Sequence, residues 1–178
     1  KKIRDLLPDV CISVDTRRAE VARLSLDEGA DMVNDVSALR DAEMIEVVSN
    51  YGCPVCVMHM RGIPENMQTD PRYGNVVSDV REYLAEATAR LVDCGVEPEQ
   101  VIVDPGIGFG KSLEHNLALL SSGREIVPDE RLGLMWGVSR KSMFSELIGR
   151  ERSEERLFGT LGIAAKSLEK GVDIIRVH

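Results

Sequence analysis

Short apolar runs alternate with longer amphipathic stretches along the whole chain of 178 residues. The runs have the length and the Val- and Ile-rich composition of buried strands. Six strands are expected, over residues 10–14, 31–36, 55–60, 101–104, 134–138 and 172–177. Strands that are regularly separated by helices form parallel βαβ units with right-handed crossovers. The pattern therefore predicts an α/β fold, with a single domain over residues 1–178.

The stretches between these runs repeat apolar residues at helical spacing, and several of them end at a glycine. The first helical pattern covers residues 1–7, and helices are then expected from Arg17 to Gly29, Asp41 to Gly52, Val76 to Gly95, from Ser112, from Ser142, and from Ser153 to Gly171. Ser and Asp at several of these starts are residue types that cap helices. The last helix is expected to bury an apolar stripe formed by Leu157, Leu161, Ala164, Ala165 and Leu168.

Polar side chains stand at or just beyond the C-terminal end of every predicted strand: Asp15, Asn34, His59, Asp104, Ser139 to Lys141, and Arg176 with His178. A (β/α)8 TIM barrel places all its strand ends around one mouth, where the active site lies. An open doubly wound sheet would use mainly the strands at its switch point. The distribution therefore favours the barrel. Because a complete barrel needs eight strands and about 250 residues, we expect this chain to hold about six of the eight βα units and to lack the first two strands and the last helix.

The net charge and the absence of long apolar windows argue against two classes of partner. The net charge of −8, from 22 basic and 30 acidic residues, argues against a general nucleic-acid binder, which usually has a basic surface. No window approaches the roughly 18 uninterrupted apolar residues of a membrane span, and no secretory leader is evident. We therefore expect neither nucleic acid nor a membrane as a partner.

Cys53 and Cys56 have the spacing of a redox pair. A thioredoxin-like pair opens a helix, where the helix dipole lowers the thiol pKa, whereas this pair opens a strand. No second pair of this spacing exists to complete a zinc site. We expect the two cysteines to be structural and, with no disulfide framework, the cytoplasm to be the compartment.

The most informative segment is DPGIGFGKS at residues 104–112, between a strand and a helix. It is not a Walker A loop, which needs glycine at the position of Pro105, nor a dinucleotide fingerprint, which needs glycine at Lys111. What remains is a buried strand that delivers the Asp104 carboxylate, followed by a glycine-rich loop whose backbone can approach a ligand. The alternative is a solvated Asp in a glycine-rich turn.

The other strand ends are ambiguous when they are taken singly. The segment from Ser139 to Ser142 holds a hydroxyl and two cations before a helix whose free N–H groups suit an anion, or it is a cap flanked by surface cations. Arg176 and His178 leave the same face of the last strand, and Arg has a forked donor that suits phosphate. Asp15 and the Asn34–Asp35 pair could instead be caps of helices or turns.

Taken together, these segments resemble the dihydropteroate synthase family in order and approximate spacing. They are SVDT at 13–16, NDVS at 34–37, MHM at 58–60 with MQ at 67–68, DPGIGFGK at 104–111, SRKS at 139–142 and RVH at 176–178. The resemblance covers essentially the whole chain. It implies a (β/α)8 barrel, usually a homodimer, that condenses 6-hydroxymethyl-7,8-dihydropterin diphosphate with 4-aminobenzoate and releases diphosphate. Sulfonamides mimic the aminobenzoate in this family.

The resemblance also implies roles for individual residues. The pterin-binding set is Asp15, Asn34, Met58, Asp104, Phe109, Lys141 and Arg176, of which Asp15 and Lys141 are the expected catalytic residues. The diphosphate is expected on Ser139, Arg176 and His178, and the aminobenzoate on Phe109 and Ser142. Mg2+ is the expected cofactor, and its protein contact in the family lies in an N-terminal segment that we expect to be missing here, so no metal ligand is expected in this chain.

Three other functions remain open at this stage. A corrinoid-dependent methyltetrahydrofolate methyltransferase uses a related barrel, but the segment from Ser139 to Ser142 is not expected in it. A non-catalytic pterin-binding relative would keep the pocket alone. A metal-dependent barrel hydrolase is disfavoured because the three histidines form no HxH motif. With two mobile loops of the family missing, the chain alone is expected to hold the pterin half-site and to lack turnover.

Overall fold

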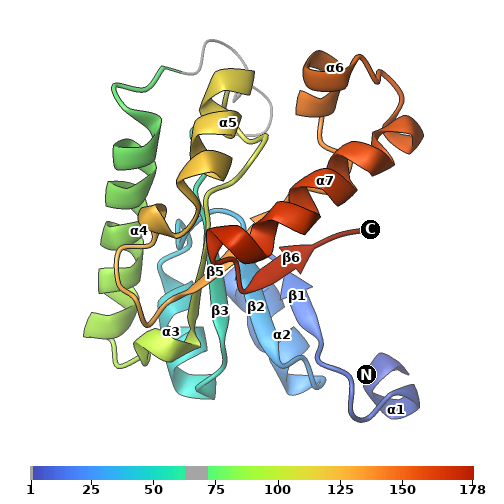
Figure 1. The fold of residues 1–178 in the computed structure, drawn as a ribbon. Coiled ribbons are helices and arrows are strands. Elements are labelled where there is room, and N and C mark those ends of the chain that lie inside the picture. The colour runs from blue at the N-terminus through green and yellow to red at the C-terminus, as the bar shows by residue number, and fades with distance from the viewer. Residues whose placement is uncertain (1, 63–71) are drawn as a thin grey trace.

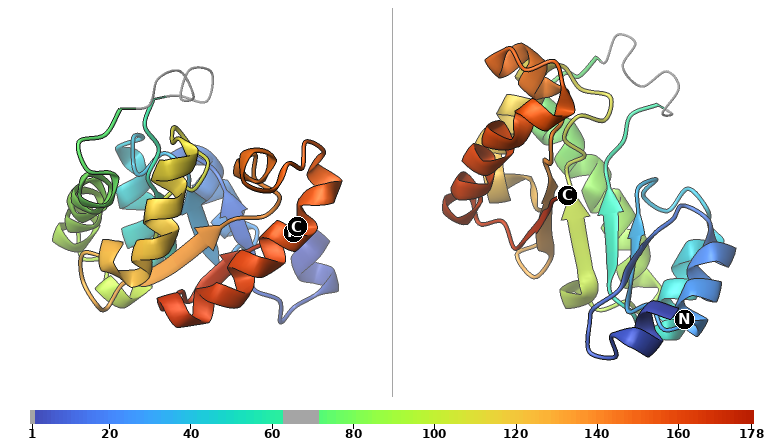
Figure 2. Two further views of the ribbon diagram at one scale, coloured as in Figure 1. Left: turned by 45° about the horizontal axis from the view of Figure 1, so that its top comes forward. Right: turned by 90° about the vertical axis from the view of Figure 1, so that its right-hand side faces the viewer.

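A computed structural model describes residues 2–62 and 72–178, and Lys1 and the MQ pair at 67–68 lie outside these ranges. Six parallel strands form one sheet in which each strand pairs with the next along the chain. They are β1 (Ser13–Asp15), β2 (Met32–Asp35), β3 (Val55–Met58), β4 (Val101–Asp104), β5 (Gly133–Gly137) and β6 (Ile174–Arg176). The six βα units that the sequence predicts are therefore confirmed, as a curled, partial (β/α) barrel (Figures 1 and 2).

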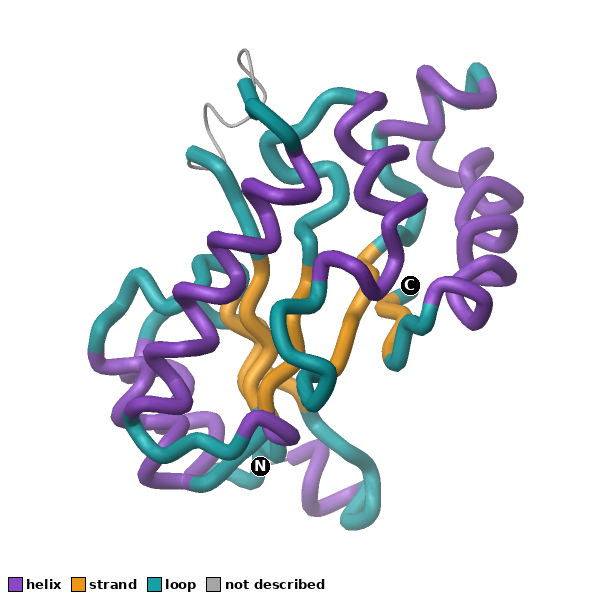
Figure 3. Tube along the Cα trace, turned by 60° about the vertical axis from the view of Figure 1, so that its left-hand side comes forward, coloured by secondary structure: helices purple, strands orange, loops and turns teal. Residues whose placement is uncertain are grey.

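The helices lie around the outside of the strands (Figure 3). The α-helices are α1 (Lys2–Leu6), α2 (Ala19–Asp27), α3 (Glu43–Tyr51), α4 (Val76–Asp93), α5 (Leu113–Ser122), α6 (Met143–Ile148) and α7 (Leu157–Ser167). The described residues also form four short 3-10 helices, which are η1 (Pro98–Gln100), η2 (Gly123–Ile126), η3 (Ser153–Arg156) and η4 (Leu168–Lys170). None of the described helices is both long enough and apolar enough to cross a membrane.

Alternation along the strands decides which side chains face the barrel interior. Val55 and Val57 of β3 belong to the hydrophobic core that also contains Leu84 and Leu91 of α4. Side chains of a strand point alternately to opposite faces, so Met58 points to the other face, into the barrel. The same alternation in β4, with Val101 and Val103 in the core, turns Asp104 to the interior, opposite Met58 in the register of the two strands.

Several predicted caps are confirmed. Asp41 accepts the backbone N–H of Glu43 at 3.2 Å and of Ala19 at 2.8 Å, so one carboxylate serves the first turns of both α3 and α2. Ser112 and His115 form a reciprocal capping box at the start of α5. The Ser153 side chain, by contrast, makes no capping bond, since residues 153–156 form η3 and α7 begins at Leu157.

The predicted buried stripe of α7 is wrong. Leu161 and Leu168 are 53% and 84% exposed, Leu157 and Ala165 are exposed, and Ala164 is only partly buried. The helix packs instead through small residues: a Cβ on Gly159 would lie 2.5 Å from the Phe144 ring, and Thr160 Oγ1 accepts the N–H of Arg140 at 2.9 Å. The close approach that glycine permits fixes the inward face, and the leucines point away from it.

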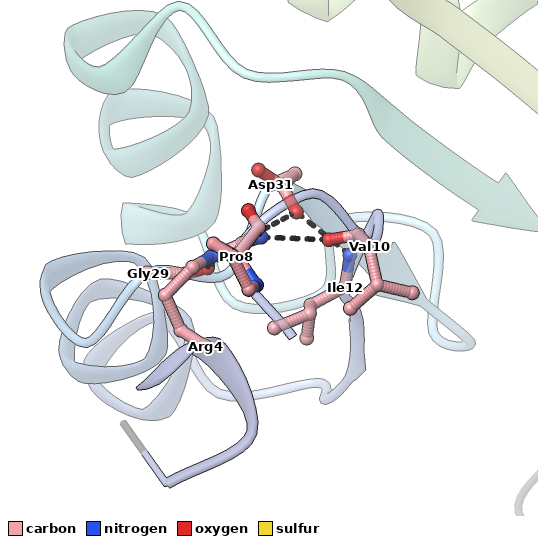
Figure 4. Close-up of polar contacts among 6 residues, drawn as sticks. All are labelled: Arg4, Pro8, Val10, Ile12, Gly29 and Asp31. Atoms are coloured by element: carbon pink, nitrogen blue, oxygen red, sulfur yellow. Dashed lines mark hydrogen bonds and ion pairs between the residues drawn. The ribbon is translucent and has the colours of Figure 1, made fainter. Parts of the chain in front are cut away.

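At the N-terminal ends of the strands, Arg4 ties α1 to the chain segments that lead into β1 and β2 (Figure 4). Its guanidinium donates to the carbonyls of Gly29 at 2.9 and 3.1 Å, and to those of Pro8 and Val10 at 2.7 Å each. It also forms an ion pair with Asp31. This cluster lies at the opposite end of the strands from the polar side chains described below.

The pair Cys53 and Cys56 forms no disulfide, and both side chains are buried. Burial raises the pKa of both thiols, well above the usual value for Cys56. A raised pKa keeps a thiol protonated and unreactive, which agrees with the structural role predicted for the pair.

Candidate active site

The C-terminal ends of the strands carry the polar side chains that the sequence predicts at the barrel mouth. Asp15 at the end of β1 accepts the Asn34 amide N–H from β2 at 2.9 Å. Its second oxygen accepts from Arg176 of β6 at 2.6 Å, across 161 residues of sequence. Among the described residues, β1 and β6 are the two edge strands of the sheet, so this ion pair links the two edges at the mouth.

A cavity of about 360 Å³ lies between these edges. Its polar lining includes Asp15, Asn34 and Arg176, and its apolar lining includes Met135 and Ile175. The Asn34 Oδ1 atom is buried and has no hydrogen-bond partner in the described part of the chain. A buried oxygen without a donor costs free energy unless a ligand or water supplies one, which makes Asn34 a candidate for contact with a ligand.

The adjacent residue, Asp35, has a different role. Its carboxylate is fully buried and accepts the N–H and hydroxyl of Ser37 and the N–H of Leu39, all within 2.8 Å. These bonds hold the left-handed residues Ala38 and Leu39 after β2. The turn-cap reading of the Asn34–Asp35 pair therefore applies to Asp35.

Asp104 is the most enclosed acid at the mouth, with 5% of the residue exposed. One of its oxygens accepts the N–H of Gly106 at 2.8 Å. Burial raises the pKa of this carboxyl, against the opposing pull of the Gly106 N–H and of the positive charges of Lys141, Lys111 and Arg176. A buried carboxylate that has cations nearby and keeps free lone pairs can accept further N–H groups from a ligand.

The glycine-rich loop after β4 closes over the end of β3. Gly106 has φ +66°, and a Cβ there would lie 1.9 Å from the His59 carbonyl oxygen. Gly108 has φ +80°, and its Cβ would lie 3.1 Å from the Lys141 side chain. No other residue type can occupy the first of these positions without moving backbone. Glycine therefore permits the close approach of the loop to the end of β3, and the approach of its backbone to a ligand stays a prediction.

Phe109 of this loop contacts Lys141 from the segment after β5. The Lys141 Nζ atom lies 3.9 Å from the centroid of the Phe109 ring, a cation–π contact. Burial lowers the pKa of Lys141 to about 8, although the Asp104 carboxylate raises it. The two side chains thus present an aromatic face with an adjacent donor, next to the Asp104 acceptor.

The remaining predicted residues lie around the rim. Ser139 Oγ accepts the backbone N–H of His178 at 3.1 Å, so two of the three residues predicted for the diphosphate are neighbours. Ser142 is exposed at the start of α6 and makes no side-chain capping bond. Met58 is 4% exposed at the end of β3. The structure therefore brings the predicted pterin and diphosphate residues to one end of the strands.

Two residues at the site were missed from the sequence. The sequence assigns no role to Lys111, although it ends the DPGIGFGK segment. In the structure Lys111 is buried against His59, with its Nζ 2.9 Å from the imidazole Nδ1. Tyr73 donates its hydroxyl to the Gly110 carbonyl at 2.9 Å, and burial raises its pKa to about 12. No pattern separates a buried lysine or tyrosine from a surface one, and only the glycine-rich context hinted that Lys111 is enclosed.

The described residues contain no group of three or more His, Cys, Asp or Glu side chains that could hold a metal ion. No step of the chemistry is assigned to a metal here.

Comparison with known proteins agrees with this geometry. A dihydropteroate synthase of Neisseria meningitidis serogroup B is 40% identical over 173 residues, which are 95% of this chain and 61% of that protein. A crystal structure of the Yersinia pestis dihydropteroate synthase with a sulfonamide drug complex has a TM-score of 0.89 and 38% identity, over 96% of this chain and 61% of that one. The Xanthomonas albilineans enzyme in complex with 7,8-dihydropteroate also has a TM-score of 0.89, with 33% identity, over 99% of this chain and 64% of that one.

The chain thus spans about 61% of the length of the Neisseria relative. The profile of the pterin binding enzyme family matches residues 1–178. With the partial barrel, the buried acid at the end of β4 and the glycine-rich loop behind it, this match shows that the chain belongs to the family of pterin binding enzymes.

Proposed function

We propose that this chain forms the pterin-binding part of a dihydropteroate synthase, which joins 6-hydroxymethyl-7,8-dihydropterin diphosphate to 4-aminobenzoate. The observation that carries the proposal is the buried Asp104 carboxylate beside the stacked Lys141 and Phe109 pair. Such a site offers a flat heteroaromatic ring an acceptor, a donor and an apolar face at once. The relatives named above have this activity in their names.

In this proposal, the pterin ring enters edge-first toward Asp104. The Asp104 carboxylate accepts hydrogen bonds from two neighbouring N–H groups of the ring. The unpartnered Oδ1 of Asn34 accepts from the remaining N–H edge of the ring, and Lys141 donates to the carbonyl side of the ring. Phe109, Met58 and the stem of Arg176 pack on the ring faces. Each buried polar atom of the site then acquires a partner, which is the condition for a stable buried polar contact.

The proposed reaction breaks the C–O bond between the pterin methylene and the diphosphate, and the diphosphate leaves with the electron pair. The aryl amine then attacks the methylene carbon, forms the C–N bond and loses a proton. Asp15 stabilises the cation that develops on the pterin, which is electrostatic transition-state stabilisation. Because Asp15 already pairs with Arg176, the guanidinium must exchange or share that partner to hold the diphosphate with Ser139 and His178.

The acceptor and the assembly are further parts of the proposal. Phe109 and Ser142 are proposed to contact the aminobenzoate, and the resemblance and the similarity to a sulfonamide-bound structure support sulfonamides as competitors there. We also propose that residues 1–178 act as one domain of a cytoplasmic homodimer. Mg2+ is proposed to act with the diphosphate through groups outside the described residues.

The test is a synthase assay of the complete natural protein that carries this chain. With both substrates and Mg2+ it should form 7,8-dihydropteroate and diphosphate, and sulfonamide should inhibit it. Methyl transfer from methyltetrahydrofolate to a corrinoid, or pterin binding with no turnover, would instead identify one of the two pterin-binding alternatives. The 178-residue chain assayed alone should bind the pterin and form no product, because it spans only about 61% of the length of the Neisseria synthase.

A further inference from the structure

Lys111 is a buried cation inside the glycine-rich loop, with 4% of the residue exposed. Its ammonium lies 2.9 Å from His59 Nδ1 and 3.0 Å from each of the carbonyl oxygens of Gly106 and Phe109. An ammonium has three N–H donors and no acceptor. The three acceptors therefore saturate it, and the charge is held by the loop on one side and by β3 on the other.

We propose that Lys111 is a positioning residue for the pterin site, whose ammonium pins the glycine-rich loop to the end of β3 and thereby fixes Asp104 and Phe109. This inference rests on the proposed pterin-binding function. The two carbonyls that accept from Lys111 belong to Gly106, which holds Asp104, and to Phe109, which is proposed to pack on the ring. Gly106 donates its N–H to Asp104 at 2.8 Å, and Phe109 stacks against the Lys141 ammonium.

The His59 side chain that accepts from Lys111 is itself held in place by its neighbours. Its backbone N–H donates to the Asp104 carbonyl at 2.9 Å, and its ring packs edge-on against Tyr83 of α4 with 4.8 Å between ring centroids. Burial, followed by the charge of Lys111, lowers the pKa of His59 to about 3. The ring is therefore neutral at working pH, with its proton on Nε2 and Nδ1 free to accept from Lys111.

The charge of Lys111 also acts on Asp104. The charged and titratable groups that interact with this carboxyl are Lys111 from the loop, Lys141 from the segment after β5, Arg176 from β6 and the Cys56 thiol from β3. Loss of the Lys111 charge leaves the burial that raises the pKa of Asp104 less opposed. Because the ring N–H groups need the ionised carboxylate, pterin affinity should then fall off at a higher pH on the acid side.

The experiment measures binding of 6-hydroxymethyl-7,8-dihydropterin across pH by calorimetry, in the complete natural protein. Lys111→Met keeps the apolar stem and removes the charge and all three hydrogen bonds. At pH 6, below the pKa of about 7 to which burial lowers Lys111, it should bind the pterin about tenfold more weakly, and its acid midpoint should rise by about one pH unit. Lys166→Met is the matched control, because Lys166 pairs with Glu169 on the exposed side of α7, and it should match the wild type.

A loop loosened by the loss of hydrogen bonds alone would lower affinity equally at all pH values, so an unshifted acid midpoint would overturn the action of the Lys111 charge on Asp104. Equal affinity of wild type and Lys111→Met would overturn the positioning role, while failure of the wild type to bind any pterin would overturn the proposed function itself. Imidazole ¹⁵N NMR of the wild type tests the contact without a variant. His59 should remain neutral with its proton on Nε2 between about pH 5 and pH 8, and a ring protonated at Nδ1 in that range would contradict the proposal.

Discussion

The sharpest perturbation of the proposed pterin site is Asp104→Asn. The amide can keep the hydrogen bond that Asp104 accepts from Gly106 at 2.8 Å, because its oxygen takes the place of that carboxylate oxygen. Its NH2 group then replaces the second oxygen and faces a ring N–H of the pterin. The substitution therefore preserves the shape of the site and places one donor against another.

The size of the effect follows from burial. A buried donor that faces a donor costs about 1–3 kcal/mol, and about 1.4 kcal/mol is a factor of ten in affinity. We expect pterin affinity to fall by about tenfold or more. Loss of the negative charge also removes the carboxylate that opposes the lowering of the Lys141 pKa by burial, which weakens the donation of Lys141 to the ring in addition.

The thermal stability of Asp104→Asn, unlike its pterin affinity, should not fall at neutral pH. Because burial raises the pKa of Asp104, the folded state favours the protonated acid, and its contribution to stability is present at low pH and lost as pH rises through the raised pKa. Asparagine has no such charge to bury. Asp104→Asn should therefore unfold at the same temperature as the wild type or higher at neutral pH, and the difference should shrink as pH falls toward the unfolded pKa near about 4.

The assay is calorimetry of pterin binding and thermal unfolding at several pH values, with Asp35→Asn as the matched control. Asp35 is the buried acid at the end of β2, and its oxygens accept only from its own turn in the described structure. Its replacement should lower the free energy of unfolding by about 1–3 kcal/mol. Unchanged pterin affinity in a folded Asp104→Asn variant would refute the placement of the ring. A loss of stability equal to that of Asp35→Asn would refute the cost assigned to burial of the Asp104 charge.

Three further substitutions test other parts of the account. Gly106→Ala places a Cβ 1.9 Å from the His59 carbonyl oxygen at φ +66°, so pterin binding should fall by at least about tenfold through a displaced loop, as calorimetry would show. Arg176→Ala should weaken binding of the pterin diphosphate at least about tenfold more than binding of the pterin alcohol, measured by competition. Arg4→Ala removes four bonds to carbonyls at the far end of the strands, and it should lower the free energy of unfolding by about 1–3 kcal/mol in denaturant titration while pterin affinity stays unchanged.

Specific results would contradict each of these expectations. Wild-type affinity of Gly106→Ala would show that the loop does not fix the ring. Equal losses for the ester and the alcohol in Arg176→Ala would place the diphosphate elsewhere. A weaker pterin site in Arg4→Ala would mean that the two ends of the strands are coupled.

The sequence predicts the strands and their order because a parallel sheet buried on both faces needs continuous apolar runs. It also predicts which end of the strands holds the candidate site residues, since polar side chains follow each apolar run at its C-terminal end. The pairing of Arg176 with Asp15 could not be predicted in this way. It joins residues 161 positions apart, and only the curl of the sheet brings the edge strands together.

Side-chain burial on short loops and on α7 also escaped prediction. The periodicity of Leu157, Leu161 and Leu168 indicates an amphipathic helix but does not say what covers it, and Gly159 with Thr160 sets the packed face instead. Lys111 is a charged residue that three specific acceptors hold inside the fold. Such contacts depend on the exact path of the glycine-rich loop, which residue types alone do not determine.

The proposed position of the pterin ring is best tested by a crystal structure of the complete natural protein with 6-hydroxymethyl-7,8-dihydropterin diphosphate bound. Ring N–H groups should lie within hydrogen-bond distance of Asp104, the ring should lie against Phe109 and Lys141, and the diphosphate should point toward Ser139, Arg176 and His178. A ligand bound away from Asp104, or a ring turned so that no N–H group meets that carboxylate, would contradict it.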